Sequence, residues 1–491
     1  MNPKDMMVVD ANAEALGIPK SSLMENAGRC VAKKIFKISK PCKVAIFAGT
    51  GGNGGDGFVA ARYLLNKDFE AEIYLLGHPS RIKSPESLNN WEVLQKINVE
   101  MNQIKIHIIE DSSQLESTDA EVIVDAILGT GTEGRLREPI SSAVDLINDS
   151  NCKVVAVDIP TGLDPKTGSV DHKAIIADAT VTFHRAKDGL KNANDKYVGT
   201  VNVCDIGIPK EAEIYTGRGD LLRLKKRDSN SHKGQNGNVL VVGGSYDYSG
   251  APALAAISAL RSGVDLSVVA CPQSVVSPIR SYSPDLIVKG LSNSYIHFDD
   301  TSKILELSEN ADLMILGCGI GRKEETGLAL NEMIEKIQIP IVIDADALKI
   351  LDIDLIKKYN KEIVLTPHKA EFKSFFGVDV PEKLDQRIDV VLDSSNECGC
   401  TVLLKGVVDV ISNGETVKLN STGNPGMTVG GTGDLLAGLV GGLIAQGHEA
   451  FEAAYLGSFI NGAAGDLVAA DYGYNFVASD ILKYIPLIFR D

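Results

Sequence analysis

Apolar and polar positions along this chain follow the pattern of short buried strands separated by amphipathic helices. Apolar side chains recur at helical spacing in residues 21–36 and 57–67. Short apolar runs that close on Gly, Pro or Asp predict strands. They cover residues 43–49, 71–77, 120–131 and 153–162. Strands that alternate with helices predict a parallel sheet with right-handed crossovers.

A second pattern of the same kind follows a polar segment. Residues 211–236 are rich in charge, glycine and serine, which predicts a domain boundary near residue 215. A strand at 238–245 and a helix at 249–263 then open a new α/β pattern. Further strands are predicted within 312–321, 340–348, 361–368 and 401–411. We therefore expect two α/β domains, residues 1–215 and 225–491.

Composition excludes several classes of protein. The chain has 491 residues and a formal net charge of −16, which argues against non-specific binding to nucleic acid. No apolar run reaches the roughly 18 residues that span a bilayer, and the first residues do not resemble a secretion signal. The eight cysteines are scattered, and we interpret them as reduced thiols of a cytoplasmic protein.

The most informative feature of the first domain is the glycine-rich run GTGGNGGDG, Gly49 to Gly57, between a predicted strand and helix. Backbone N–H groups of such a loop can bind a phosphate. The dinucleotide fingerprint is incomplete, since the next predicted strand ends in Gly77 rather than in an acid. There is no P-loop lysine either. A tight turn without a ligand is the alternative, but so many glycines cost backbone entropy.

Polar residues follow the predicted strands of this domain. Asn53, Asp125 and either Asp158 or Thr161 could converge on the glycine loop, because ligands bind at the carboxyl ends of parallel strands. Oxygen ligands of this kind suit a hard cation. Asp125 could instead act as a general acid or base, and each aspartate could simply be a turn residue.

The second domain has its own glycine loop, NPGMTVGGTGDLLAG, residues 424–438. Its backbone N–H groups would lie at a helix N-terminus and face negative charge. Asp434 follows the loop and could take a proton from a hydroxyl that attacks phosphorus, although it could also only cap the helix dipole. His368 and Lys405 end two other predicted strands and are further candidates for ligand contact.

The first half resembles the NAD(P)HX epimerase (YjeF N-terminal) family over about residues 1–215, through the motifs GTGGNGGDGFVAARYL, VDAILGTGTEGRLR and VAVDIPTGLDPKTG. The resemblance implies that Asp125 drives epimerisation and that Asn53, Asp125 and Thr161 bind potassium. It also implies a site for the hydrated dinucleotide. That site comprises Gly52, Asn53, Gly54, Gly55, Asp56, Gly129, Thr130, Gly131, Thr132, Glu133, Gly134, Arg135 and Asp158.

The second half resembles a ribokinase-like fold and, more closely, the ADP/ATP-dependent NAD(P)HX dehydratase family, through SHKGQNGNVLVVGGS, LGCGIGR, TPHKAEF, LLKGVVDVI and the second glycine loop. A proline is common in that family where this chain has Cys318. The resemblance implies that Asp434 is the catalytic base and contacts the hydrate together with Ala255, Gly319 and His368. It implies an adenine-nucleotide site at Lys405, Gly406, Val407, Val408, Asp409 and Gly433.

Together the two resemblances imply one repair enzyme for hydrated nicotinamide cofactors. We expect a Rossmann-like, doubly wound domain that epimerises R- and S-NAD(P)HX, and a ribokinase-like domain that dehydrates the S form. The expected donor is ADP with Mg²⁺, giving AMP and phosphate, and the epimerase site is expected to use K⁺. We expect no nucleic-acid or membrane partner, and a homo-oligomer.

Two alternatives remain open from the residues alone. A ribokinase-class small-molecule kinase with an accessory domain would leave a stable phosphorylated product. A nucleotide sensor would bind without turnover, but binding alone would tolerate the loss of Asp125 and Asp434.

Overall fold

The computed structural model describes residues 1–101, 104–131, 134–292 and 294–490, and it divides into two compact units, residues 1–212 and 213–491. Residues 213–215, which the sequence analysis placed in the first domain, belong to the second unit. There Tyr215 pairs with Leu419, and the Thr216 N–H donates to the Leu419 carbonyl over 2.7 Å.

Unit 1 is built on a parallel sheet of seven strands in the order β3-β2-β1-β4-β5-β6-β7, the doubly wound arrangement expected. The strands are β1 (Lys43–Ala48), β2 (Glu70–Leu76), β3 (Ile104–Ile109), β4 (Val122–Ala126), β5 (Lys153–Val157), β6 (Ala179–Phe183) and β7 (Thr200–Cys204). The helices are α1 (Pro3–Ala15), α2 (Lys20–Ile38), α3 (Gly52–Leu65), α4 (Pro85–Met101), α5 (Ile140–Asn148), α6 (Asp188–Asn192) and α7 (Asp195–Val198).

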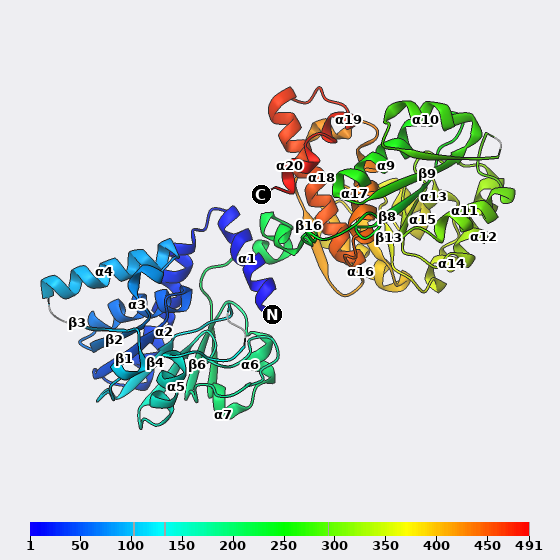
Figure 1. Ribbon diagram of the computed structural model, residues 1–491. Coiled ribbons are helices and arrows are strands. Elements are labelled where there is room, and N and C mark those ends of the chain that lie inside the picture. Colours follow the sequence, from blue (N-terminus) through cyan, green and yellow to red (C-terminus); the bar gives the residue numbers. More distant parts are fainter. Residues whose placement is uncertain (102–103, 132–133, 293, 491) are drawn as a thin grey trace. The chain divides into compact units, whose positions relative to one another are not determined.

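Two apolar cores lie on the two faces of this sheet. Helices α1 to α4 bury their apolar faces on one side, around Phe58 and Trp91, whose rings lie 5.3 Å apart. Helix α5 covers the other side with Ala143, Val144 and Ile147 (Figure 1). The chain order reverses between β1 and β4, which are neighbours in the sheet. Ligands of doubly wound sheets bind beyond the strand ends at such a reversal, so this edge is where a site is expected.

Unit 2 carries a nine-stranded sheet in the order β10-β9-β8-β11-β12-β13-β14-β15-β16. The strands are β8 (Asn238–Val242), β9 (Leu266–Pro272), β10 (Ile287–Leu291), β11 (Leu313–Leu316), β12 (Ile341–Ile343), β13 (Ile363–Leu365), β14 (Thr401–Leu404), β15 (Asp409–Ser412) and β16 (Val417–Asn420). The strands up to β14 pair in parallel, whereas β14, β15 and β16 pair antiparallel. The run 401–411, predicted as one strand, therefore forms two strands joined by a turn at residues 405–408.

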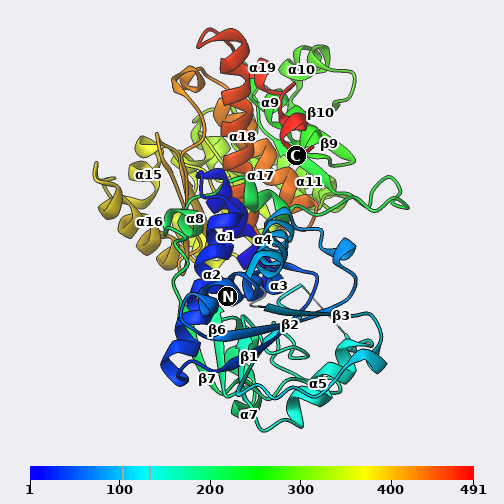
Figure 2. The same cartoon turned by 90° about the vertical axis from the view of Figure 1, so that its left-hand side faces the viewer.

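The helices of unit 2 cover both faces of its sheet (Figure 2). The helices are α8 (Glu211–Ile214), α9 (Gly250–Ser262), α10 (Val276–Tyr282), α11 (Thr301–Ser308), α12 (Glu324–Lys336), α13 (Ala347–Ile350), α14 (Ile353–Lys358), α15 (Lys369–Phe376), α16 (Leu384–Cys398), α17 (Thr432–Ala445), α18 (Ala450–Tyr472), α19 (Ala478–Ile481) and α20 (Ile485–Ile488), of which α8 begins just before the division between the units.

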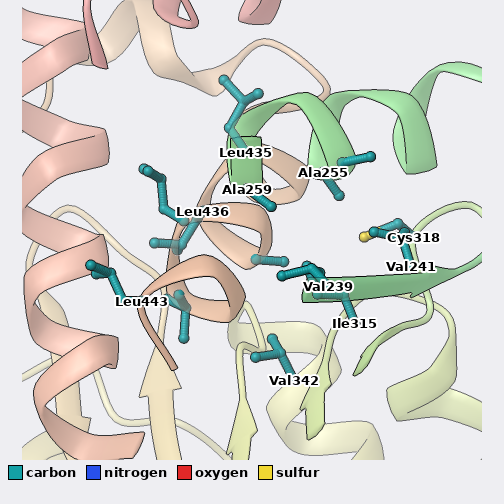
Figure 3. Packing of buried hydrophobic residues seen from close by; sticks show 14 of the residues in the cluster. Val239, Val241, Ala255, Ala259, Ile315, Cys318, Val342, Leu435, Leu436 and Leu443 are labelled. Carbon is teal, nitrogen blue, oxygen red and sulfur yellow. The ribbon is translucent and has the colours of Figure 1, made fainter. Parts of the chain in front are cut away.

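Helix α17 is central to this unit because it packs on the sheet and also against α9 and α18, which contact the same sheet. Figure 3 shows Leu435, Leu436 and Leu443 of α17 near Ala255 and Ala259 of α9 and near the strand residues Val239, Ile315 and Val342. Close packing fixes the direction of the helix, and with it the position of the glycine loop at its N-terminus. Within the described residues, no helix has the length and apolar character that a membrane span needs.

Candidate functional sites

Unit 1 has a cavity of about 620 Å³ at the reversal between β1 and β4. The glycine loop after β1, the loop after β4 and the strand end of β5 all reach it. Its polar and charged lining residues are Asp10, Lys20, Thr50, Asn53, Ser84, Asp56, Glu86, Thr130, Asp158 and Lys187.

Glycines are required in the first loop by close backbone approach. A Cβ on Gly49 would lie 2.0 Å from the Ile127 carbonyl oxygen, and one on Gly54 would lie 1.9 Å from the Gly49 carbonyl oxygen. By contrast, Gly51 and Gly52 have nothing within 4 Å of such an atom and line the cavity. Helix α3 begins at Gly52, so its unpaired N–H groups meet the cavity and suit an anion.

Three of the predicted residues form one network next to the cavity. Asn53 donates from its side-chain nitrogen to the carbonyls of Leu128 (3.0 Å) and Val157 (2.9 Å). Thr161 donates to both carboxylate oxygens of Asp125, from its backbone N–H and from its hydroxyl. Asn53 lines the cavity, whereas Asp125 and Thr161 lie behind the lining and are almost fully buried. Burial raises the pKa of Asp125 to about 6, although the hydrogen bonds from Thr161 oppose this shift.

Asp158 lies in the cavity lining and is held in an unusual conformation. Its φ is +63°, a region that aspartate tolerates better than most residues do. Its carboxylate accepts from the Thr182 hydroxyl (3.0 Å), the Phe183 N–H (3.3 Å) and the Lys187 ammonium. Lys187 is only 1% exposed and also donates to the Thr182 hydroxyl.

Two more carboxyl groups line the same cavity. Burial raises the pKa of Asp10 to about 6, with the Lys187 charge acting in the opposite direction. Burial also raises the pKa of Asp56 well above its usual range, and the charge of Asp158 adds to the effect. Sequence reasoning missed Asp10 and Lys187. Neither follows a predicted strand, and they reach the cavity from α1 and from the loop before α6.

The residues of the predicted stretch 129–135 do not all line the same cavity. Gly129, Thr130 and Gly131 line the cavity. Gly134 and Arg135 line a neighbouring cavity, which shares Gly131 with the first. Thr132 and Glu133 lie outside the described residues. Gly129 to Gly131 therefore lie beside the glycine loop, and Arg135 lines the neighbouring cavity instead.

In unit 2, Asp434 lies in the first turn of α17, directly after the glycine loop. Burial raises its pKa to about 7, and the charge of Asp344 contributes, while the Cys318 thiol and the Lys405 ammonium lower it. The Cys318 sulfur and one carboxylate oxygen from each aspartate lie within 4.8 Å of one another. A carboxyl group with a pKa near 7 can serve as a general base at neutral pH.

Lys405 connects this group to the nucleotide candidates. Its Nζ lies 2.9 Å from Asp344 Oδ1, which also accepts from the Thr366 hydroxyl at 2.8 Å. A cavity of about 410 Å³ opens beside it. Of the predicted nucleotide residues, Lys405, Gly406, Val407, Asp409 and Gly433 line that cavity, and Val408 does not.

The three other residues predicted to contact the hydrate in unit 2, Gly319, His368 and Ala255, lie in different surroundings. Gly319 has a φ of +66°, and a Cβ there would lie 2.9 Å from the Cβ of Tyr248. His368 caps α15, because its Nδ1 accepts from the backbone N–H groups of Ala370 and Glu371, and its side chain is half exposed. Ala255 is fully buried in the packing of α9 against α17. Gly319 and His368 can meet a ligand, whereas the Ala255 side chain packs in the core.

Two family models match this chain, one in each unit. Residues 20–189 match the model of the YjeF-related protein N-terminus, and residues 239–487 match the NAD(P)H-hydrate dehydratase model.

Relatives match along the whole chain. It is 51% identical to the bifunctional NAD(P)H-hydrate repair enzyme Nnr of Methanothermobacter thermautotrophicus, over 99% of this chain and 95% of that one. It is 42% identical to the protein of the same name from Archaeoglobus fulgidus, over 99% and 97%.

Among solved structures, unit 2 is similar to the ADP/ATP-dependent NAD(P)H-hydrate dehydratase from Bacillus subtilis, co-crystallized with ATP and Mg²⁺. The identity is 26% and the TM-score 0.50, over 56% of this chain and 97% of that one. The ribokinase-like fold expected for the second domain is confirmed by this likeness.

Proposed function

The chain belongs to the family of bifunctional NAD(P)H-hydrate repair enzymes, and from this premise we propose which residues of each unit carry its two activities. The enzyme epimerises R- and S-NAD(P)HX and dehydrates the S form to NAD(P)H with an adenine nucleotide. We assign epimerisation to the cavity of unit 1 and dehydration to the glycine loop of unit 2.

In unit 1 the pyrophosphate of the hydrate would bind at the N-terminus of α3, over Gly51 and Gly52. Both glycines line the cavity and leave room for close approach. The nicotinamide ring would then lie in the cavity lined by Asp56 and Asp158. The catalytic role that the family resemblance implies for Asp125 stays a prediction, because its carboxylate lies behind the lining.

We propose K⁺ as the ion of this site, with Asn53, Asp125 and Thr161 as its ligands. The donor set fits: it consists of hard oxygen atoms with one negative charge, which suits a monovalent cation. Asn53 uses its nitrogen for two carbonyls, and among the described residues no donor reaches its Oδ1. When bound, the ion would supply positive charge beside the glycine loop, and these residues would hold the loops after β4 and β5 in register.

In unit 2 the observation that carries the assignment is the position of Asp434 in the first turn of α17, next to Gly433 of the cavity lining, together with the rise of its pKa to about 7. Asp434 would take the proton of the C6 hydroxyl as its oxygen attacks the terminal phosphorus, and the bond to the AMP oxygen would break. Backbone N–H groups of the loop would stabilise the charge on the transferred phosphoryl group. Loss of phosphate from C6 and of a proton from C5 then restores the C5–C6 double bond.

We propose ADP as the phosphoryl donor, with AMP and phosphate as products. This choice rests on the resemblance to microbial bifunctional enzymes. Magnesium would enter on the nucleotide's phosphates and neutralise their charge. The carboxylates of Asp344 and Asp434 beside the loop are oxygen donors of the kind that it prefers, so the residues present fit it.

The test is the recovery of reduced cofactor from a mixture of R- and S-NADHX with Mg²⁺ and K⁺, with ADP, with ATP or without nucleotide. Complete ADP-dependent recovery supports both assignments. Recovery that stops at the S fraction contradicts the epimerase assignment. A stable phosphorylated product would indicate a small-molecule kinase instead.

A further inference from the structure

The cavity of unit 1 holds two carboxyl groups in opposite environments. Asp56 faces the cavity from α3, and no described residue donates a hydrogen bond to its carboxyl group. Asp158 faces it from the end of β5 and accepts from three donors, one of them the buried ammonium of Lys187. The first arrangement favours a neutral acid, and the second stabilises a negative charge. Two carboxyl groups in such contrasting surroundings are the usual mark of an acid–base pair.

The reaction needs such a pair. The R and S hydrates differ at C6, which bears the hydroxyl and is bonded to the ring nitrogen N1. The hydroxyl can leave as water if an acid protonates it while the N1 lone pair forms a double bond to C6. Water can then add to the opposite face of C6 if a base removes its proton.

Resting on the proposed function of unit 1, we propose that Asp56 is the general acid and Asp158 the general base of epimerisation. Asp56 transfers its proton to the C6 hydroxyl, the C6–O bond breaks, and water leaves an N1=C6 iminium ion. A water molecule forms the new C6–O bond from the other face and gives one proton to Asp158. The net transfer of one proton from Asp56 to Asp158 is reversed by a turnover in the opposite direction or by exchange with solvent.

Two further residues act on Asp56 and Asp158. Lys187 is a positioning residue, since it binds Asp158, Thr182 and the Phe183 carbonyl and is too buried to move. Asp10, on α1, is a second acidic neighbour whose charge raises the pKa of Asp56. The remaining charged groups of the lining are Lys20 and Glu86, on α2 and α4.

Asp125 acts through its neighbours in this scheme. It is fully buried and bonded to Thr161 and to the Ile127 N–H, so it holds the loops after β4 and β5. Its loss lowers activity by disturbing the cavity wall and the cation, and a pH profile distinguishes this from loss of the acid.

The first experiment measures interconversion of purified R- and S-NADHX by chromatography in the full-length protein, without nucleotide. Asp56→Asn is expected to lower kcat by roughly 10²- to 10⁴-fold with KM within about three-fold of the wild type. Asp158→Asn is expected to lower kcat similarly, because it removes the base. The backbone should be kept, since asparagine also tolerates a positive φ. Asp68→Asn, which changes an exposed carboxyl outside this lining at a residue that also has a positive φ (61°), is the matched control and should stay within about three-fold.

The pH dependence of the epimerisation rate tests the role of Asp56 as the acid. The wild-type rate should fall at high pH as Asp56 loses its proton. Asp10→Asn should move this fall to lower pH, because it removes one of the charges that raise the pKa of Asp56. A profile of Asp10→Asn that coincides with that of the wild type would count against the pairing.

Exchange of the C6 oxygen with solvent tests whether the C6–O bond breaks. In water labelled with ¹⁸O, each epimerisation should place one labelled oxygen on C6. Retention of the original oxygen through epimerisation would overturn the mechanism and point to opening of the C6–N1 bond.

The outcomes distinguish this inference from the proposed function. If the wild-type protein does not interconvert the epimers, the assignment of unit 1 fails. If the wild type does so and Asp56→Asn keeps its activity, only the acid–base pair fails. Each variant should dehydrate pure S-NADHX with ADP at the wild-type rate, which shows that the protein is folded.

Discussion

Thr161 binds both carboxylate oxygens of Asp125: its hydroxyl donates to Oδ1 and its backbone N–H to Oδ2, each over 2.7 Å. The same hydroxyl accepts from the Leu128 N–H over 3.0 Å. One side chain therefore joins β4 to the loop after β5, next to the cavity of unit 1.

Replacing the hydroxyl should break this connection. Thr161→Val keeps the shape of the side chain but removes one of the two donors to Asp125 Oδ1, the other being the Ile127 N–H, and it leaves the Leu128 N–H without its acceptor. We expect a loss of about 1–3 kcal/mol in the free energy of unfolding. We also expect a weaker activation of epimerisation by K⁺, measured by titration with KCl. Unchanged K⁺ dependence would contradict the assigned ligand set.

Removal of the Asp125 carboxylate should affect the repair of the two epimers differently. Asp125→Ala should still convert S-NADHX to NADH with ADP, while R-NADHX disappears only at its slow spontaneous rate. The comparison uses each pure epimer with the same variant. Rapid use of both epimers would contradict any role of Asp125 in epimerisation.

The pKa of Asp434 predicts the pH dependence of dehydration. Burial raises it to about 7, so the carboxylate is present above that pH and is lost as pH falls through it. The rate with S-NADHX and saturating ADP should therefore rise through about pH 7 and level off above. A rate that is flat between about pH 6 and 8 would exclude Asp434 as the base.

The thiol of Cys318 should tune this base. Its sulfur lies within 4.8 Å of an Asp434 carboxylate oxygen, and the thiol lowers the pKa of that carboxyl. Cys318→Ala should move the midpoint of the pH profile upward by about 0.5–1 unit, the size of one net hydrogen bond. Cys318→Ser keeps a donor and should move it less, and Cys271→Ala, a buried cysteine elsewhere, should leave it unchanged. Identical profiles for all variants would show that the thiol has no such effect.

Stability of unit 2 should depend on the contact between α9 and α17. A Cβ on Gly438 would lie 2.2 Å from the Ala255 carbonyl oxygen. Gly438→Ala should therefore destabilise the protein by about 1–3 kcal/mol through overpacking, seen as a lower melting temperature. Gly250→Ala, at the open start of α9, is the control, since nothing lies within 4 Å of that position. Equal melting temperatures for the two variants would contradict the close packing of the helices.

Patterns of apolar residues predicted the strand that precedes the first glycine loop, but they missed β16, which precedes the second, and others. Strand β3 lies at the sheet edge, and Lys105 and His107 interrupt its apolar run. Strand β6 is buried yet carries Thr180 and Thr182, whose hydroxyls bind the Val198 carbonyl and Asp158. Buried polar side chains with such partners cannot be recognised from alternation alone.

The site was predictable where its residues follow strands. Asn53, Asp56 and Asp158 line the first cavity. Asp10 and Lys187 reach it only through tertiary packing, so no local pattern indicates them. The cap that His368 forms is a similar case, because the sequence shows its place after a strand and not its hydrogen bonds.

The most direct test of the two-site account is the Asp434→Asn variant incubated with pure S-NADHX, ADP, Mg²⁺ and K⁺. The account predicts that R-NADHX accumulates to equilibrium, as followed by chromatography, while no NADH forms. A folded variant that has lost both activities, or one that still forms NADH with ADP, would contradict it.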